Sequence, residues 1–272
     1  MDKLDFSSFN VELRGDPATA KSVVICLHGF LGSARNLLRI TDGLYRAGHC
    51  VISYDQRGHG RSAWTKNYGV DDFANDVFTI INHYGLKSVH LVGHSMGGRV
   101  SLQATSLKPD YVRTLTLLDV GPNTTNTAVD DVRSVVDPLP EEFSSKEEMD
   151  SFFKKYHVAI ATWLMGNLKK KAATDGATDS GYKWIFDLNG LKVFLNKGIQ
   201  LDQRENFKNL RCPTLVLHGD RSKHISKEEA VEMKKLNPSV EYAVIPNAGH
   251  WIHVDNPSAT LDAVKNFLEK NQ

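Results

Sequence analysis

The sequence predicts one α/β domain with a central, mostly parallel sheet and a helical insertion. Short apolar runs rich in β-branched residues recur along the 272 residues, and longer segments with apolar residues at helical spacing lie between them. Strands that helices cover on both faces form such continuous apolar runs, because both of their sides are buried. A chain of this length can bury one full core, so no second core is needed.

Six runs are expected to form strands, and each ends in a turn that contains Gly, Asp or Pro: residues 22–27, 50–54, 88–92, 112–118, 214–217 and 242–245. Four segments have the spacing of helices: 36–47, 70–84, 96–107 and 258–270. Ligands of such sheets bind where the strands end at their carboxyl termini. We therefore expect the functional residues in the loops that follow the strands.

The alternation of strands and helices breaks between residues 122 and 207. A polar loop (123–127) precedes a mostly helical stretch (144–171), a loop of Gly, Ala, Thr and Asp (172–181) and a second amphipathic part (182–206). We expect residues 1–122 and 207–272 to form an α/β core. Residues 123–206 are then a mainly helical cap, or lid, inserted between two of its strands.

Charge and cysteine content narrow the classes of partner. Thirty-three Lys and Arg balance thirty-two Asp and Glu, which disfavours nucleic acid and anionic membranes as partners and favours a small molecule. The three cysteines, Cys26, Cys50 and Cys212, lie in or beside apolar runs, as reduced buried thiols do. No apolar run resembles a signal segment or a membrane span. We expect a cytoplasmic protein, monomeric or homodimeric.

The clearest chemical motif is Gly93-His94-Ser95-Met96-Gly97, which lies between a strand pattern and a helix pattern. This is the setting of the G-x-S-x-G nucleophile elbow, in which the serine occupies a strained turn from strand to helix. Glycine is needed two positions to either side because larger side chains would collide there. Ser95 is therefore the predicted nucleophile, and the N–H of Met96 is a predicted donor of the oxyanion hole at the helix start.

The remaining members of the site are sought after other strands. His28-Gly29-Phe30 follows the run 23–27, and the Phe30 N–H is the predicted second oxyanion donor. His250 follows the last strand and is the predicted general base, since chain order in this architecture is serine, acid, histidine. Two loops can supply the acid, which leaves Asp119 and Asp220 as candidates.

The whole chain resembles the α/β-hydrolase superfamily. The shared motifs are the elbow, H-G-x-x-G-S at 28–33, D-x-R-G-x-G-x-S at 55–62 and A-G-H-W at 248–251. Many members carry the acid where this chain has Ser222. YbfF-type esterases and ABHD11-like hydrolases lack that acid and use the aspartate that ends the preceding strand. The stretches 119–122, 184–188 and 249–253 resemble that subgroup, and this resemblance implies Asp119 as the acid of the catalytic triad.

The expected activity is that of a serine esterase that acts through an acyl-enzyme on small to medium esters, with no metal or organic cofactor. Apolar and aromatic residues of the cap suggest an apolar acyl or alcohol group, although packing explains most of them equally well. An acyltransferase, a thioesterase, a carbon-carbon bond hydrolase or a ligand-binding receptor of the same fold remain alternatives. Within the D-x-R-G motif, Asp55, Arg57, His59 and Ser62 are expected to support the turn.

Overall fold

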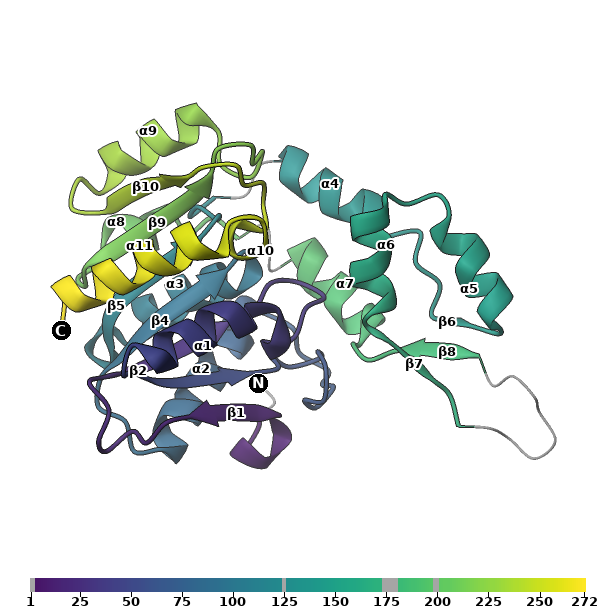
Figure 1. The fold of residues 1–272 in the computed structure, drawn as a ribbon, viewed down its shortest axis with the longest axis horizontal. Helices are drawn as coiled ribbons and strands as arrows, with labels where there is room; N and C mark the ends of the chain where they lie inside the picture. The colour runs from purple at the N-terminus through teal and green to yellow at the C-terminus, as the bar shows by residue number, and fades with distance from the viewer. Residues whose placement is uncertain (1–2, 124–125, 173–180, 198–200) are drawn as a thin grey trace.

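The α/β fold expected from the sequence is confirmed in the computed structural model, which describes residues 3–123, 126–172, 181–197 and 201–272. The main sheet of this part has the order β1-β3-β2-β4-β5-β9-β10 (Figure 1). β1 runs antiparallel to β3, and the other neighbouring strands are parallel. Its strands are β1 (Val11–Arg14), β2 (Val23–Leu27), β3 (Cys50–Tyr54), β4 (Val89–His94), β5 (Val112–Leu118), β9 (Thr214–Gly219) and β10 (Glu241–Ile245).

The six predicted strands are all present, and β1 is an additional one. β2 and β3 are buried along their whole length, which explains their uninterrupted apolar sequence. β1 is a half-exposed edge strand of four residues, Val-Glu-Leu-Arg. Such a short run has too few residues to establish a period, so its sequence alone did not predict a strand.

Helices cover both faces of the sheet. On one face α1 (Leu38–Arg46) and α11 (Pro257–Lys270) pack on a cluster that includes Val24, Cys26 and Val92. On the other lie α2 (Val70–His83), α3 (Met96–Leu107), α8 (Arg204–Lys208) and α9 (Lys227–Leu236). The shorter helices are η1 (Phe6–Ser8), η2 (Ala34–Leu37), η3 (Pro109–Tyr111) and α10 (Ile252–Asp255).

Helix α9 was not predicted, and its composition explains why. It buries only Met233 fully and carries charged residues over most of its surface, so its apolar periodicity is weak. Its start is nevertheless encoded locally. The Ser226 hydroxyl accepts from the Glu229 N–H while the Glu229 carboxylate accepts from the Ser226 N–H, which is a capping box.

Between β5 and β9 the chain leaves the core and forms a separate layer, here called the insert (residues 126–197), at one side of the molecule (Figure 1). It contains α4 (Asn126–Val136), α5 (Lys146–Phe153), α6 (Val158–Met165), α7 (Leu188–Lys197) and an antiparallel sheet of β6 (Glu142–Phe143), β8 (Tyr182–Trp184) and β7 (Leu168–Lys170).

This small sheet differs from the sequence pattern, which indicated helix through residue 171 and an amphipathic part from 182. Strands of two or three residues are shorter than any window in which a period can be recognised, and they pair with partners distant in sequence. The rings of Phe143, Phe153, Trp184 and Phe186 pack together within the insert and belong to a hydrophobic cluster that continues into the α/β core. Most of the loop at 172–181 and residues 124–125 of the loop at 123–127 lie outside the described residues.

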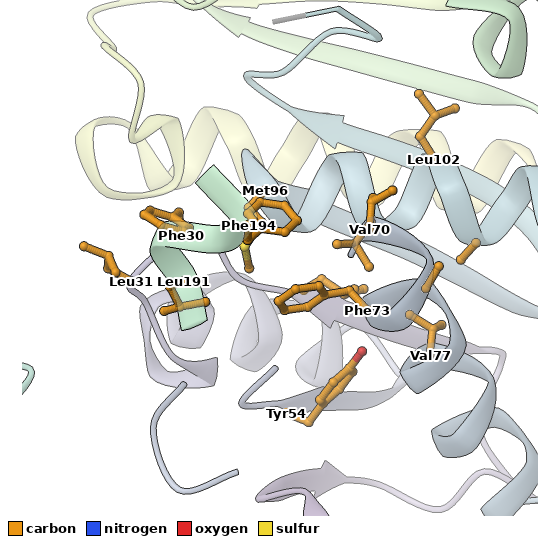
Figure 2. Close-up of a cluster of buried hydrophobic side chains, with 14 of the residues drawn as sticks. Phe30, Leu31, Tyr54, Val70, Phe73, Val77, Met96, Leu102, Leu191 and Phe194 are labelled. Carbon is orange, nitrogen blue, oxygen red and sulfur yellow. The ribbon is translucent and has the colours of Figure 1, made fainter. Parts of the chain in front are cut away.

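Helix α7 attaches the insert to the core. Figure 2 shows Phe194 and Leu191 of α7 beside Phe30, and the Phe194 ring centroid lies 5.0 Å from that of Phe73 and 6.2 Å from that of Phe30. Just before α7, the Asp187 carboxylate accepts from the Tyr68 hydroxyl at 2.7 Å. The insert is thereby packed directly on the loop that follows β2.

The two connections of the insert meet at α3. The buried Arg99 guanidinium donates to the Gly121 carbonyl on the entering connection and to the Leu201 carbonyl on the returning one. Burial lowers the pKa of Arg99 to about 10, so it stays charged at neutral pH. Because Arg99 lies one turn after Ser95, the helix that begins at the elbow also holds the base of the insert.

Two further observations concern membrane-spanning helices and cysteines. None of the helices described is both long and apolar enough to cross a membrane. All three cysteines are free thiols, with Cys26 and Cys50 buried and Cys212 partly buried.

Candidate active site

Ser95 occupies a strained backbone position at the junction of β4 and α3. Its φ of 51° and ψ of −117° lie outside the regions that L-residues normally adopt. A Cβ atom at Gly97 would lie 2.3 Å from the Leu27 carbonyl oxygen, and one at Gly93 would lie 2.4 Å from the Gly97 carbonyl oxygen. The glycines are therefore required by close backbone approach. Ser95 itself remains partly exposed at the carboxyl end of the sheet.

Asp119, directly after β5, is fully buried and also has a positive φ, of 53°. Its Oδ2 accepts from His250 Nδ1 at 2.8 Å and from the Ser222 hydroxyl at 2.5 Å. Its Oδ1 accepts from the Gly219 N–H at 3.0 Å and from His218 Nδ1 at 3.2 Å.

These bonds decide the charge of Asp119. Burial alone would raise the pKa of this carboxyl group, but the hydrogen bonds from His218, His250 and Ser222 outweigh burial and hold the pKa well below its usual range. Asp119 is therefore a carboxylate at neutral pH. A carboxylate only accepts hydrogen bonds, so His250 carries a proton on Nδ1 and, when neutral, presents the lone pair of Nε2.

Asp220, the other candidate acid, has different hydrogen-bond partners. It is exposed, and its carboxylate accepts from the N–H groups of Asn247 and Ala248 at 2.9 and 3.0 Å. Those bonds lower its pKa. Asp220 thus supports the loop that carries His250, whereas Asp119 contacts the imidazole of His250 itself.

Four residues around this pair were not singled out as parts of the site from the sequence. Ser222 stands where many relatives carry the acid, and its hydroxyl donates to the acid from the neighbouring strand. His218 donates to the same carboxylate, and His94 Nε2 donates to the His250 carbonyl oxygen at 2.9 Å. The ring of His224 stacks on that of His250, with centroids 3.6 Å apart and planes 16° apart. Only Ser222 had a sequence signal, namely its place in the motif.

The loop after β2 passes close to the serine. A Cβ atom at Gly29 would lie 3.5 Å from the Ser95 Cβ. His28 donates to the Gly29 carbonyl oxygen at 2.8 Å and accepts from the Gln56 N–H at 3.0 Å, which fixes a neutral tautomer. Within the described residues, the N–H groups of Phe30 and Met96 donate no hydrogen bond to the protein.

Residues of the D-x-R-G-x-G-x-S turn form hydrogen bonds with the backbone of the loop that follows β2. Asp55 accepts from the Ala34 N–H at 2.9 Å, and His59 Nε2 accepts from the Leu31 N–H at 3.2 Å. Ser62 donates to the Asp55 carbonyl oxygen at 2.5 Å. Arg57 instead reaches α2, where it forms a buried two-pronged ion pair with Asp76 at 2.6 and 2.7 Å. The structural role expected for this motif is consistent with these contacts.

Further histidines crowd the site without forming a metal centre. The His94 ring lies 4.8 Å from the His250 ring and 4.4 Å from the His253 ring, centroid to centroid. Burial is the main cause that lowers the pKa of His253 to about 4 and that of His94 well below its usual value. No group of three or more metal-ligating side chains is found in the part of the chain that the structure describes.

A serine elbow on a mostly parallel sheet is the architecture of an α/β hydrolase. A family model described as alpha/beta hydrolase fold matches residues 22–257. The chain belongs to this family, and it is a hydrolase. The resemblance found in the sequence is confirmed.

Individual relatives match the chain over most of its length. The Mus musculus protein named sn-1-specific diacylglycerol lipase ABHD11 is 29% identical over 274 residues, covering 96% of this chain and 84% of that protein. Esterase YbfF of Escherichia coli (strain K12) is 23% identical over 251 residues, covering 91% of this chain and 93% of that protein.

A solved structure of a marine microorganism esterase superposes with a TM-score of 0.80 at 24% identity, over 96% of this chain and 99% of that one. At this identity the structural likeness shows the fold alone.

Proposed function

We propose that this protein is a carboxylic ester hydrolase that uses Ser95 as nucleophile, His250 as general base and Asp119 as the acid of the triad. The observation that carries the proposal is the 2.8 Å hydrogen bond between His250 and the buried Asp119 carboxylate. The His250 ring also lies 4.8 Å from that of His94, the residue before the elbow serine. The relatives named esterase and lipase support the assignment to ester hydrolysis.

In the proposed reaction His250 Nε2 takes the proton of the Ser95 hydroxyl while the serine oxygen attacks the ester carbonyl. The N–H groups of Phe30 and Met96 stabilise the oxyanion. His250 then gives its proton to the leaving alcohol, and an acyl-enzyme forms. A water molecule releases the acid by the same proton transfers. Asp119 keeps Nδ1 protonated and stabilises the imidazolium that forms in each half-reaction.

The insert is proposed to act as a cap that shapes the substrate site. Phe143, Phe153, Trp184 and Phe186 are buried in the hydrophobic cluster, which makes them poor candidates for substrate contact. Trp163 of α6 is different, because its ring lies 5.6 Å from that of Trp251, the neighbour of His250, and both residues are only partly buried. This pair favours an apolar acyl or alcohol group of small to medium size.

A fluorophosphonate probe and a chain-length series of p-nitrophenyl esters test the proposal. Wild type is expected to be labelled at Ser95 and to hydrolyse the esters, and Ser95→Ala is expected to lose both. Ser106→Ala, at an exposed serine of the same helix, is the matched control and should retain both. Failure of the probe to label Ser95 in folded wild type would contradict the proposal.

The same purified protein can be tested for acyl transfer to acceptors other than water and for activity on, or binding of, compounds other than esters. Acyl transfer to an alcohol or thiol would identify an acyltransferase, and faster cleavage of acyl thioesters would identify a thioesterase. Tight binding of a ligand without its turnover would identify a receptor of the same fold. The complete set of Ser95, His250 and Asp119 favours turnover over sensing, because a receptor would not need it.

A further inference from the structure

The loop between β9 and α9 carries two residues that contact the proposed acid and base. Ser222 donates to Asp119 Oδ2 at 2.5 Å, the same oxygen that accepts from His250. The Ser222 hydroxyl in turn accepts from the His224 N–H at 3.1 Å. The His224 ring then lies face to face with the His250 ring, 3.6 Å away.

We propose that His224 is a positioning residue, whose ring holds the His250 imidazole in plane during the proton transfers. This inference rests on the proposed role of His250 as general base. The His250 imidazole is held by its Cβ–Cγ bond and by one hydrogen bond at Nδ1, and small tilts of the ring plane remain possible. A parallel ring against one face opposes the tilt, so Nε2 stays directed at its partner.

The charges around His224 agree with a neutral ring. Burial, then the nearby His250, lower the pKa of His224 to about 4, and Asp119 opposes this only in part. On its other sides His224 lines a small cavity with charged residues of α8 and α9, namely Arg204, Glu229 and Glu232. At neutral pH, His224 therefore adds no second positive charge beside the imidazolium that His250 becomes.

Three substitutions separate stacking from bulk and from charge. His224→Phe keeps a flat ring, His224→Leu keeps volume without one, and His224→Ala removes both. His83→Phe is the matched control, because His83 also stacks on an aromatic ring, that of Phe6 at 3.4 Å, but at the end of α2. Melting temperatures show whether each variant folds. If His224→Ala does not fold, wild type is compared with His224→Leu instead.

The kinetic expectation is specific to kcat. His224→Leu and His224→Ala should lower kcat for a p-nitrophenyl ester about 3- to 10-fold, the size of one stacked contact, with KM changed less than about twofold. His224→Phe and His83→Phe should stay within about twofold of wild type in kcat. If His224→Leu keeps wild-type kcat, or if His224→Phe falls as far as His224→Leu, the proposal is overturned.

Nuclear magnetic resonance of the Nδ1 proton of His250 gives a readout that needs no ester turnover. Its low-field signal should remain sharp in wild type and His224→Phe and should shift and broaden in His224→Leu. An unchanged signal in His224→Leu would overturn the positioning role. If wild type neither labels at Ser95 nor cleaves esters, the proposed function fails instead, and the resonance still tests the stacking.

The pH profile tests the neutral state of His224. Since its ring is neutral above about pH 5.5, the acid limb of kcat/KM should have the same midpoint in wild type and His224→Phe. A midpoint displaced in His224→Phe would show that the charge of His224 contributes, and would overturn this part of the proposal.

Discussion

Replacing Asp119 by asparagine removes the charge that faces His250 and keeps the shape of the side chain. Asp119 is fully buried and lies 2.8 Å from His250 Nδ1. At that separation a unit charge pair is worth about 6 kcal/mol if the effective dielectric constant is about 20. Desolvation of the pair offsets part of this energy, so we expect kcat to fall by about three to four orders of magnitude.

Asp220→Asn is the matched comparison, because it makes the same chemical change in the other candidate acid. Asp220 is exposed, and its carboxylate accepts from the N–H groups of Asn247 and Ala248 in the loop before His250. We expect it to lower kcat less than about tenfold.

Both variants are assayed with one p-nitrophenyl ester at pH 8, with circular dichroism and melting temperature as checks of folding. A larger loss of kcat in Asp220→Asn than in Asp119→Asn would refute the assignment. So would a loss of less than about tenfold in a folded Asp119→Asn, because a buried carboxylate on the base cannot be that dispensable.

Three further predictions concern stability. Gly97→Ala should lower the free energy of unfolding by about 3 kcal/mol or more in urea titrations, because the alanine Cβ would lie 2.3 Å from the Leu27 carbonyl oxygen. A variant as stable as wild type would contradict the close approach of Gly97 to the Leu27 backbone. Asp76→Asn should cost about 3 kcal/mol by the same measurement, because it removes the carboxylate that lies 2.6 Å from the buried Arg57 guanidinium and leaves Asp72, 4.0 Å away, as the remaining partner. A loss below about 1 kcal/mol would count against the Arg57–Asp76 pair. His90 is buried, and burial lowers its pKa to about 4. Between pH 6.5 and 4 the unfolded chain therefore binds a proton at His90 that the folded chain does not bind. The free energy of unfolding falls as the pH falls through this range. In His90→Gln the slope of unfolding free energy against pH near pH 5 should be smaller by up to about 1.4 kcal/mol per pH unit, and an unchanged slope would exclude this source.

The sequence by itself determined the fold class, the six parallel strands and the positions of Ser95 and His250 after β4 and β10. These features are local. A buried parallel strand requires a continuous apolar run, and an elbow requires glycines two residues before and after the serine, so both leave their mark within a few adjacent residues. An insertion was predicted for the same reason, as the segment in which that pattern stops.

The sequence left Asp119 and Asp220 open on position alone, because both follow strands whose carboxyl ends meet at one edge of the sheet. Tertiary structure decided which carboxylate contacts His250. β5 and β9 are neighbours. The positive φ at Asp119 directs its buried carboxylate at the imidazole, and the donors His218 and Gly219 of β9 and Ser222 of the following loop hold it there. The stacking of His224 and the pairing of the short strands of the insert were likewise decided only in three dimensions. A contact between residues that are remote in sequence produces no periodic pattern or motif around either residue, so the sequence alone does not reveal it.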